Sequence, residues 1–293
     1  MPALLLLAAL VTGSGDSLLV SPAWLAAHQK DRDLVLLEVA MSREAYDRGH
    51  IPGARWLNPH LLIDGGPPGA ELPPVARIDS VLAAMGVTER SRIVYYGDTW
   101  MSPRVFLALE YIGLGDRTAL LDGGLQAWRE EKRPLTTEVP TWQPGRLASQ
   151  AHREILVDAA WLRTHLDDSS LALLDGRSAG EYAGTDHSEG LPRFGHIPGA
   201  VNLQWEKTFT AEAAALDGTQ SRLKPAEALR QLLAASGGRE GSAVVTYCTV
   251  GYRAAHLYFV ARYLGLHPRL YDGSMSEWSR MPSLPMVEGA ARR

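Results

Sequence analysis

The string His-Ile-Pro-Gly-Ala occurs at residues 50–54 and again, unchanged, at residues 196–200. Two further pairs of segments match in the same order: Tyr-Ile-Gly-Leu at 111–114 with Tyr-Leu-Gly-Leu at 263–266, and Asp-Gly-Gly-Leu-Gln-Ala-Trp at 122–128 with Asp-Gly-Ser-Met-Ser-Glu-Trp at 272–278. The spacing between partners drifts by only a few residues, which indicates one long unit duplicated with short insertions and not the short period of a solenoid. The sequence therefore predicts two homologous domains.

Each half of the chain alternates short apolar runs with segments of helical spacing. The apolar runs are bounded by Gly and Asp and predict buried parallel strands at 34–37, 92–96, 118–121, 171–174, 242–247 and 269–271. Helical spacing occurs near 103–113, 225–235 and 252–264, and Ser21-Pro22 predicts the start of another helix. This alternation predicts α/β domains, each with a parallel sheet covered by helices on both faces.

The domain boundaries follow from changes in composition. From Pro134 to about Arg153, Thr, Pro, Gly and Gln replace any periodic apolar pattern, as is usual in an interdomain linker. We therefore expect the following division: an N-terminal domain at 20–134, a linker at 135–153, a C-terminal domain at 154–285 and a tail at 286–293.

The sequence pattern of residues 1–19 predicts a leader peptide. The apolar run at 3–11 is about half as long as a helix that crosses a membrane, and small polar residues follow it at 12–15. This pattern is typical of a secretory signal peptide and would place the protein in the periplasm or outside the cell. No Lys or Arg precedes Lys30, so the alternative is a wrongly assigned start or an extra N-terminal strand in a cytoplasmic protein.

The composition of the 293 residues narrows the classes of function. Hydrophobic residues make up 46% of the chain, enough for packed cores, and no segment reaches membrane-spanning length. Lys and Arg number 29 against 33 Asp and Glu, and this balance argues against a nucleic-acid partner. The nine His are scattered singly, so we expect no metal site and no cofactor.

The chain contains one cysteine, Cys248, which excludes an intrachain disulfide and a thiolate metal cluster. Cys248 follows the predicted strand 242–247 and opens the loop Cys248-Thr-Val-Gly-Tyr-Arg253 ahead of a predicted helix. Ligands of parallel α/β sheets collect at such strand ends, and backbone N–H groups at a helix N-terminus bind anions. Gly251 lets the loop curl, and this setting favours a reactive thiolate over the buried, inert cysteine that is the common case.

Together, four features make the chain resemble a tandem-domain rhodanese over residues 20–285: the duplicated His-Ile-Pro-Gly-Ala, the motif Asp175-Gly-Arg177 at a strand end, the loop 248–253, and the segment 272–278. The resemblance implies two homologous rhodanese-like domains and a thiosulfate or 3-mercaptopyruvate sulfurtransferase. It also implies a catalytic C-terminal domain and an inactive N-terminal copy. Asp98 stands in the first half where Cys248 stands in the second, and a carboxylate cannot perform sulfur–sulfur chemistry.

By this resemblance, Cys248 takes a sulfane sulfur from a small anionic donor, forms a persulfide, and passes the sulfur to a thiophilic acceptor such as cyanide or a thiol. Thr249, Val250, Gly251 and Tyr252 form the active-site loop, whose amides would hold the persulfide. The spacing Cys-x4-Arg is one residue shorter than the Cys-x5-Arg of cysteine phosphatases, so it suits a terminal sulfur better than a phosphoryl group. The alternative is a noncatalytic persulfide carrier that delivers sulfur to an acceptor protein.

Two arginines are the candidate substrate-binding residues. Arg177 matches the family arginine that binds the anionic end of the donor, and the alternative is a salt bridge with Asp175. Arg253 would bind substrate or close the loop through hydrogen bonds to its carbonyls. Thr249 and Val250 match neither the basic residues of thiosulfate enzymes nor the Gly-Ser-Gly of mercaptopyruvate enzymes. Arg253, which stands where mercaptopyruvate enzymes have Thr, favours thiosulfate.

Residues at equivalent positions of the repeat are expected to be structural: His50 and His196 in the turn before Ile-Pro-Gly-Ala, and Trp128 and Trp278 in the two cores. Asp272 and Ser274 follow a predicted strand end close to the expected site. Ser274 would either orient the substrate or hydrogen-bond the loop, and the role of Asp272 stays open.

Overall fold

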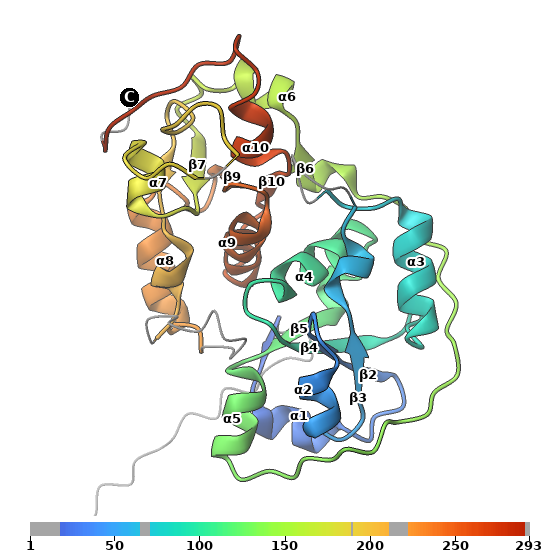
Figure 1. Cartoon of the computed structure of the whole chain (residues 1–293). Coiled ribbons are helices and arrows are strands. Elements are labelled where there is room, and N and C mark those ends of the chain that lie inside the picture. Colours follow the sequence, from blue (N-terminus) through green and yellow to red (C-terminus); the bar gives the residue numbers. More distant parts are fainter. Residues whose placement is uncertain (1–17, 65–70, 189, 211–221, 291–293) are drawn as a thin grey trace, which may run out of the picture.

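The computed structural model describes residues 18–64, 71–188, 190–210 and 222–290. These residues form two parallel five-stranded sheets, one in each half of the chain (Figure 1). The first sheet has the order β1-β5-β4-β2-β3 and the second the order β6-β10-β9-β7-β8, so both halves share one topology and the predicted duplication is confirmed. The strands are β1 (Leu19–Val20), β2 (Leu34–Val39), β3 (Ala54–Leu57), β4 (Arg92–Gly97) and β5 (Thr118–Leu121), then β6 (Leu156–Val157), β7 (Leu171–Asp175), β8 (Val201–Asn202), β9 (Ala243–Tyr247) and β10 (Arg269–Tyr271).

Helices connect the strands in both halves, as the alternation predicted. In the first half they are α1 (Pro22–His28), α2 (Glu44–Arg48), α3 (Val75–Ala84), α4 (Ser102–Tyr111) and α5 (Gly124–Glu130). In the second half they are α6 (Ala159–Thr164), α7 (Ala179–Ala183), α8 (Ala226–Ala235), α9 (Tyr252–Tyr263) and α10 (Ser274–Trp278). The helix start predicted at Ser21 is confirmed, because Ser21 Oγ accepts the Trp24 N–H at 3.1 Å. No helix among the residues described is long and apolar enough to cross a membrane.

The six predicted strands are present, whereas the sequence analysis missed the four outer strands β1, β3, β6 and β8. Three of these contain only two residues, too short to show any periodicity. Each pairs in parallel with a longer neighbour, for example β8 with the end of β7 through Leu174 and Val201. The neighbouring strand supplies the hydrogen bonds that stabilise these short segments, and such tertiary pairing leaves no local signal in the sequence.

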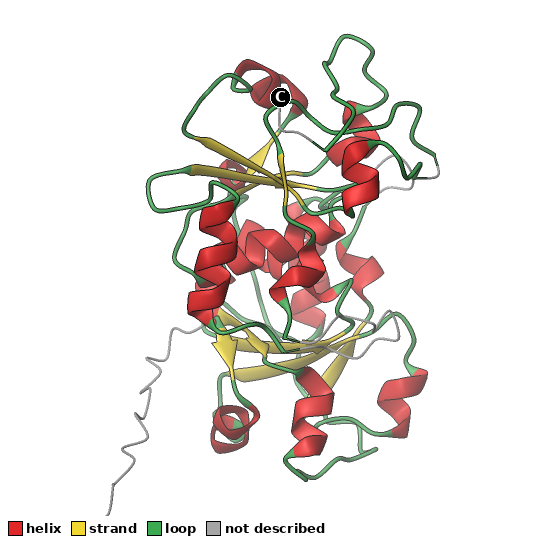
Figure 2. Cartoon of the chain, turned by 90° about the vertical axis from the view of Figure 1, so that its left-hand side faces the viewer, coloured by secondary structure: helices red, strands yellow, loops and turns green. Residues whose placement is uncertain are grey.

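Side chains that alternate along the strands divide the interior into three apolar layers. In β4, Ile93 and Tyr95 face a central cluster, while Val94 and Tyr96 face an outer cluster of the first domain. The second sheet likewise separates the central cluster from an outer cluster of its own. Figure 2 shows helices lying between the two sheets and also on their outer sides. The fold class is therefore as predicted, and the central layer belongs to both domains.

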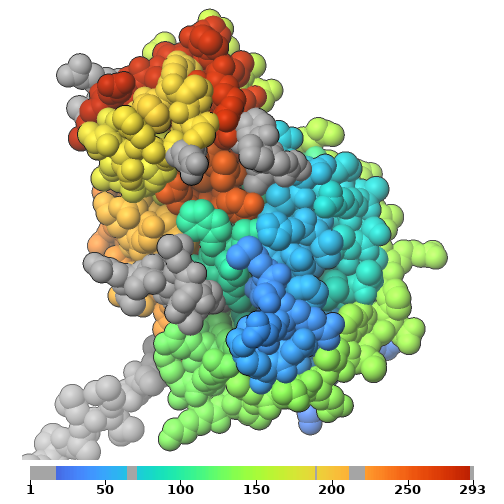
Figure 3. All heavy atoms as spheres, in the orientation of Figure 1, coloured from blue at the N-terminus to red at the C-terminus, as the bar shows by residue number. Residues whose placement is uncertain are grey.

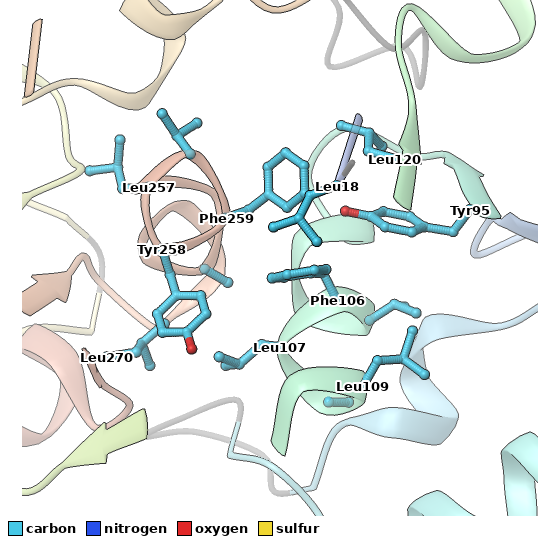
Figure 4. Close-up of a cluster of buried hydrophobic side chains, with 14 of the residues drawn as sticks. Leu18, Tyr95, Phe106, Leu107, Leu109, Leu120, Leu257, Tyr258, Phe259 and Leu270 are labelled. Carbon is cyan, nitrogen blue, oxygen red and sulfur yellow. The ribbon is translucent and has the colours of Figure 1, made fainter. Parts of the chain in front are cut away.

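Helices α4 and α9 lie against each other in this central layer (Figure 1). Nearly all residues of α4 and the central residues 254–261 of α9 are buried, as expected for helices that are enclosed on every side. Figure 4 shows Phe106 of α4 beside Phe259 of α9, and their rings meet edge to face with centroids 4.9 Å apart. In Figure 3 green-teal atoms of the first half lie directly against orange atoms of the second. The two domains thus share one hydrophobic core.

Because the core is shared, we expect Phe259→Ala to destabilise both domains together. Removing a buried phenyl ring costs about 3–5 kcal/mol, and the single urea transition should move to lower concentration without splitting. Far-UV circular dichroism and tryptophan fluorescence would measure it, since both domains contain Trp. Leu61→Ala, on an exposed side chain, is the control and should change stability by less than about 0.5 kcal/mol. Two separate transitions in Phe259→Ala would contradict the shared core.

The repeated His-Ile-Pro-Gly-Ala string makes the same contacts in each domain. The ring of His50 stacks on Tyr46 with centroids 3.7 Å apart, and His50 Nδ1 hydrogen-bonds the Tyr46 carbonyl at 2.8 Å. His196 repeats both contacts with Tyr182, at 3.7 Å and 2.9 Å. Both histidines are fully buried and each hydrogen-bonds backbone, which is the structural role expected of them.

The segment between the domains has no helix or strand from 133 to 152 apart from one bridge at Thr136, and it packs along the first domain (Figure 1). Trp142 Nε1 donates to the Ala84 carbonyl at 2.8 Å, and the Ser149 N–H donates to Asp79 at 2.9 Å. The expected tail is also held in part, because Val287 pairs with His196 through two backbone hydrogen bonds. The expected leader lies outside the described residues, apart from Leu18 and Leu19.

Candidate active site

Cys248 follows directly on β9 and precedes α9, at the carboxyl end of a central strand. The residue is 1% exposed and belongs to the core cluster shared by both domains. The backbone N–H of Gly251 donates to Cys248 Sγ at 3.1 Å, and Gly251 adopts φ +95° where the loop enters α9. The loop therefore directs a backbone donor at the sulfur from the N-terminus of a helix. Such a donor stabilises an anionic thiolate or persulfide.

The first residues of α10 hold the backbone of Cys248. Ser274 Oγ accepts the Cys248 N–H at 3.2 Å and donates to the Tyr271 carbonyl at 3.0 Å. The Met275 N–H donates to the Cys248 carbonyl at 3.0 Å. Ser274 adopts φ +50°, a conformation that costs a residue other than glycine about 1–3 kcal/mol. The Ser274 hydroxyl thus supports the loop backbone, the second of the two roles considered for it.

Arg253, at the end of the loop, is held by a carboxylate that the sequence analysis missed. Its guanidinium donates to both oxygens of Glu181, at 2.6 Å and 2.8 Å, and to Thr249 Oγ1 at 2.5 Å. Both charged side chains are largely buried, and a bidentate pair of this kind is strong and directional. Arg253 therefore connects the loop to α7 through hydrogen bonds to side chains. The sequence analysis had expected hydrogen bonds from Arg253 to the carbonyl groups of the loop.

Glu181 lies at the start of α7, where it has a second role. It completes a capping box with Ser178, whose N–H donates to Glu181 Oε2 at 3.0 Å. Burial alone would raise the pKa of the Glu181 carboxyl, but the hydrogen bonds and charge of Arg253, with hydrogen bonds from Ser188 and Ser178, lower it well below the usual 4.5. The pattern Ser-x-x-Glu at 178–181 was visible in the sequence, but as a capping box it predicts only the start of a helix.

Arg177 lies at the end of β7 and is 1% exposed. Its Nε donates to both Asp175 oxygens, at 3.0 Å and 3.1 Å, and its Nη2 donates to Asp175 at 2.6 Å and to the Gly195 carbonyl at 2.8 Å. The structure thus shows the salt bridge with Asp175 that was one of the two interpretations. Burial lowers the pKa of Arg177, but the charge of Asp175 outweighs it and leaves the pKa raised. Donor binding by Arg177 stays a prediction.

In the first domain, Asp98 comes directly after β4, but the strand pairings place Gly97, one residue earlier, opposite Cys248. Asp98 Oδ1 accepts the backbone N–H groups of Trp100 and Met101, both at 2.8 Å, just before α4. The loop amides that would face a sulfur anion are occupied here by the chain's own carboxylate. This occupancy gives a physical reason to expect no sulfur chemistry in the first domain.

Aromatic side chains from both domains surround the loop. Tyr252 and Val250 are half-buried, and the Tyr252 ring lies 6.0 Å from that of Trp100, which belongs to the first domain. Trp100 also meets Trp205 edge to face at 5.6 Å, and the Arg253 guanidinium lies 5.7 Å from the Trp100 ring centroid. The domain without the nucleophile therefore forms part of the wall around the site, which the sequence analysis did not predict.

His256, one turn into α9, adds a pH-dependent contribution to stability. It is buried beside Trp205 and Phe209, and its Nε2 lies 2.7 Å from Thr208 Oγ1. The Thr208 hydroxyl donates to the Trp205 carbonyl, so Nε2 of His256 donates to Thr208 Oγ1. Burial lowers the pKa of His256 from 6.5 to about 3.

We expect the free energy of unfolding to decrease as the pH falls below 6.5, because the unfolded chain then binds a proton at His256 that the folded chain excludes. The loss approaches about 1.4 kcal/mol per pH unit, and above pH 6.5 His256 adds no slope. Urea unfolding at pH 7.5, 6.5 and 5.5 would measure this dependence. His256→Gln should be less stable at pH 7.5 and should have a smaller slope. An unchanged slope in His256→Gln would contradict the assignment.

Comparison with known proteins agrees with this architecture. The rhodanese-like domain family matches residues 21–131 and, a second time, residues 158–281. The chain therefore belongs to the rhodanese family, as the sequence motifs indicated. The crystal structure of the 3-mercaptopyruvate sulfurtransferase SseA from Escherichia coli superposes with a TM-score of 0.75 at 23% identity, over 88% of this chain and 98% of that one. At this identity the likeness supports the fold alone.

Curated relatives match nearly the whole chain. It is 34% identical over 288 residues to the sulfur carrier protein TtuD of Thermus thermophilus, covering 92% of this chain and 96% of the relative. It is also 34% identical over 281 residues to a thiosulfate sulfurtransferase of Azotobacter vinelandii, with the same two coverages. A probable 3-mercaptopyruvate sulfurtransferase of Pseudomonas aeruginosa is 32% identical over 287 residues, covering 92% of this chain and 98% of the relative.

Proposed function

We propose that this chain is a sulfurtransferase that moves a sulfane sulfur through a persulfide on Cys248. The thiolate attacks the outer sulfur of thiosulfate, the sulfur–sulfur bond of the donor breaks, and sulfite leaves with the electron pair. Cyanide or a thiol then attacks the terminal sulfur, and thiocyanate or a new persulfide leaves as the thiolate returns. The observation that carries the proposal is the Gly251 N–H directed at Cys248 Sγ, in the domain copy that retains a nucleophile.

The cysteine content supports this chemistry. Cys248 is the one cysteine of the chain, so no neighbouring thiol can attack the persulfide and release its sulfur as a disulfide forms. A protected persulfide is what both a transferase and a carrier require.

We infer thiosulfate as the preferred donor over 3-mercaptopyruvate. Arg253 ends the loop where mercaptopyruvate enzymes carry Thr, and two of the relatives are thiosulfate sulfurtransferases of 33–34% identity. The Arg253–Glu181 and Arg177–Asp175 pairs each sum to zero charge. Attraction of the donor anion therefore rests largely on the N-terminus of α9 and the loop amides.

A sulfur carrier is the second candidate, and the similarity to TtuD favours it. In this case the Cys248 persulfide would go to one acceptor protein and small acceptors would be poor substrates. The two candidates share the first half-reaction and differ only in the second.

One experiment tests both candidates. The protein is incubated with thiosulfate, its intact mass is measured, and thiocyanate is then assayed after cyanide is added. A gain of ~32 Da, one sulfur atom, followed by repeated turnover supports the transferase. The same gain with negligible turnover supports the carrier, and no gain and no thiocyanate would refute both. Replacing thiosulfate by 3-mercaptopyruvate compares the donors.

We further propose that residues 1–19 are a leader that directs export to the periplasm or outside the cell. The apolar run at 3–11 and the small polar residues after it support this. Determination of the mature N-terminus tests the proposal. Retention of Met1 in the native protein would contradict the export proposal.

A further inference from the structure

A buried ion pair joins the two domains directly behind the catalytic loop. Arg104, on α4 of the first domain, is fully buried and donates through Nη1 to Asp272 Oδ1 at 2.6 Å. The other oxygen of Asp272 accepts the Leu72 N–H, also from the first domain, at 3.3 Å. Asp272 therefore belongs to the catalytic domain but takes both of these hydrogen bonds from the domain that lacks the nucleophile.

This ion pair packs on the residue whose N–H faces the sulfur. A Cβ atom at Gly251 would lie 3.0 Å from Arg104 Nη1 and 3.2 Å from Asp272 Oδ1, so the pair fills the space where a side chain would stand. Gly251 in turn donates to Cys248 Sγ. Asp272 also precedes the turn in which Ser274 accepts the Cys248 N–H. The Gly251 N–H that contacts the sulfur and the Ser274 hydroxyl that accepts the Cys248 N–H thus both adjoin the Arg104–Asp272 pair.

The matching contact on the other side of the internal repeat shows which features both domains share and which occur only beside the catalytic loop. Asp122 is the counterpart of Asp272, and it too accepts a backbone N–H from the opposite domain, that of Leu223 at 3.2 Å. An ion pair joins Asp122 to the partly exposed Arg222 at 3.6 Å, and matching the helix ends at Tyr111 and Tyr263 places His256 of α9 opposite Arg104. The carboxylate-to-backbone contact is therefore common to both sides. The buried arginine from the central helix occurs on the side of the catalytic loop.

We propose that Arg104 is a positioning residue of the catalytic loop, supplied by the inactive domain. It fixes Asp272 and packs on Gly251, so that the Gly251 N–H stays directed at Cys248 Sγ. It also neutralises the Asp272 carboxylate, which would otherwise place an uncompensated negative charge beside an anionic sulfur. This inference rests on the proposed function and adds a reason why the chain retains a domain without a nucleophile.

The test compares R104Q and R104K with R262Q in the full-length protein. Arg262 is a matched control, because it also joins the domains, through Glu110 at 2.6 Å and Asp116 at 2.8 Å, but from the far end of α9. One readout is kcat and KM with thiosulfate and cyanide. The other is the pH dependence of alkylation by iodoacetamide, which reports Cys248 alone because the chain has one cysteine.

For R104Q we expect kcat to fall about 10-fold or more with a smaller change in KM, and the midpoint pH of alkylation to rise by about one unit. R104K should keep the midpoint pH of alkylation near that of the wild type. Its kcat should fall about 3-fold, because the lysine ammonium cannot reproduce the planar geometry of the guanidinium. R262Q should keep both values.

A folded R104Q with wild-type kcat and midpoint would overturn the proposal, and so would an equal loss in R262Q. If R104Q does not fold, wild-type kcat in R104K would overturn it. Absence of sulfur transfer by the wild type refutes the proposed function instead, while the alkylation midpoints still decide the role of Arg104.

Discussion

Cys248→Ser should reduce thiocyanate formation from thiosulfate and cyanide by on the order of 10³-fold or more, to the background rate. A serine hydroxyl is a far weaker nucleophile than a thiolate and cannot form a persulfide. The fold should remain intact, since a hydroxyl fits the volume of the thiol and accepts the Gly251 N–H that the sulfur accepts in the wild type. Rates from initial thiocyanate formation, with intact mass after donor treatment, measure both effects.

The repeat provides the matched control for this variant. Asp98 lies in the matching loop of the first domain, and Asp98→Asn retains an oxygen that can accept the N–H groups of Trp100 and Met101. We expect Asp98→Asn to keep the wild-type rate and to gain the same mass of one sulfur. Turnover by Cys248→Ser equal to that of the wild type would refute the persulfide mechanism.

The second large effect concerns Glu181→Gln, which should destabilise the protein and reduce kcat together. Without the carboxylate, the largely buried Arg253 loses its compensating charge, and breaking such a pair costs about 3–5 kcal/mol. Thr249 shares these hydrogen bonds, and Gln retains only one acceptor oxygen, so the connection between the loop around Cys248 and α7 is weakened. Urea unfolding at pH 7 measures the stability. Glu44→Gln, from an exposed pair with Arg48, is the control and should cost less than about 0.5 kcal/mol.

The pH dependence makes this prediction sharper. The folded-state pKa of Glu181 is lowered, so its pairing stabilises the protein above the unfolded value of about 4.5 and is lost as the pH falls below it. The difference in stability between the wild type and Glu181→Gln should therefore be full at pH 7 and should shrink below pH 4.5. A difference that stays constant down to pH 3 would contradict the ion pair as its cause.

Much of the architecture could be predicted from local patterns. The repeated string, the apolar runs and the spacing of Gly and Asp predicted two copies of one α/β unit, and the six main strands lie where those runs do. The position of Cys248 between β9 and α9 could be predicted as well. These features are local, because a strand end followed by a helix start is encoded within a dozen adjacent residues.

The contacts that shape the site were not predictable in this way. Glu181 and Arg253 are far apart in the sequence. The short motif at 178–181 indicates only that Glu181 caps a helix, and it gives no sign of the ion pair with Arg253. From the sequence, Arg177 could either bind the substrate or form a salt bridge with Asp175. The structure shows it buried and paired with Asp175. The choice depends on burial, which only the packed chain determines.

By itself, then, the sequence determined the duplication, the fold class and the copy that carries a nucleophile. Only the tertiary structure decided that α4 and α9 share one core, and that Arg104 of the first domain reaches the loop of the second. The physical reason is that periodicity and caps arise from neighbours along the chain. Ion pairs and shared cores arise between segments that meet only after both sheets have folded and packed against each other.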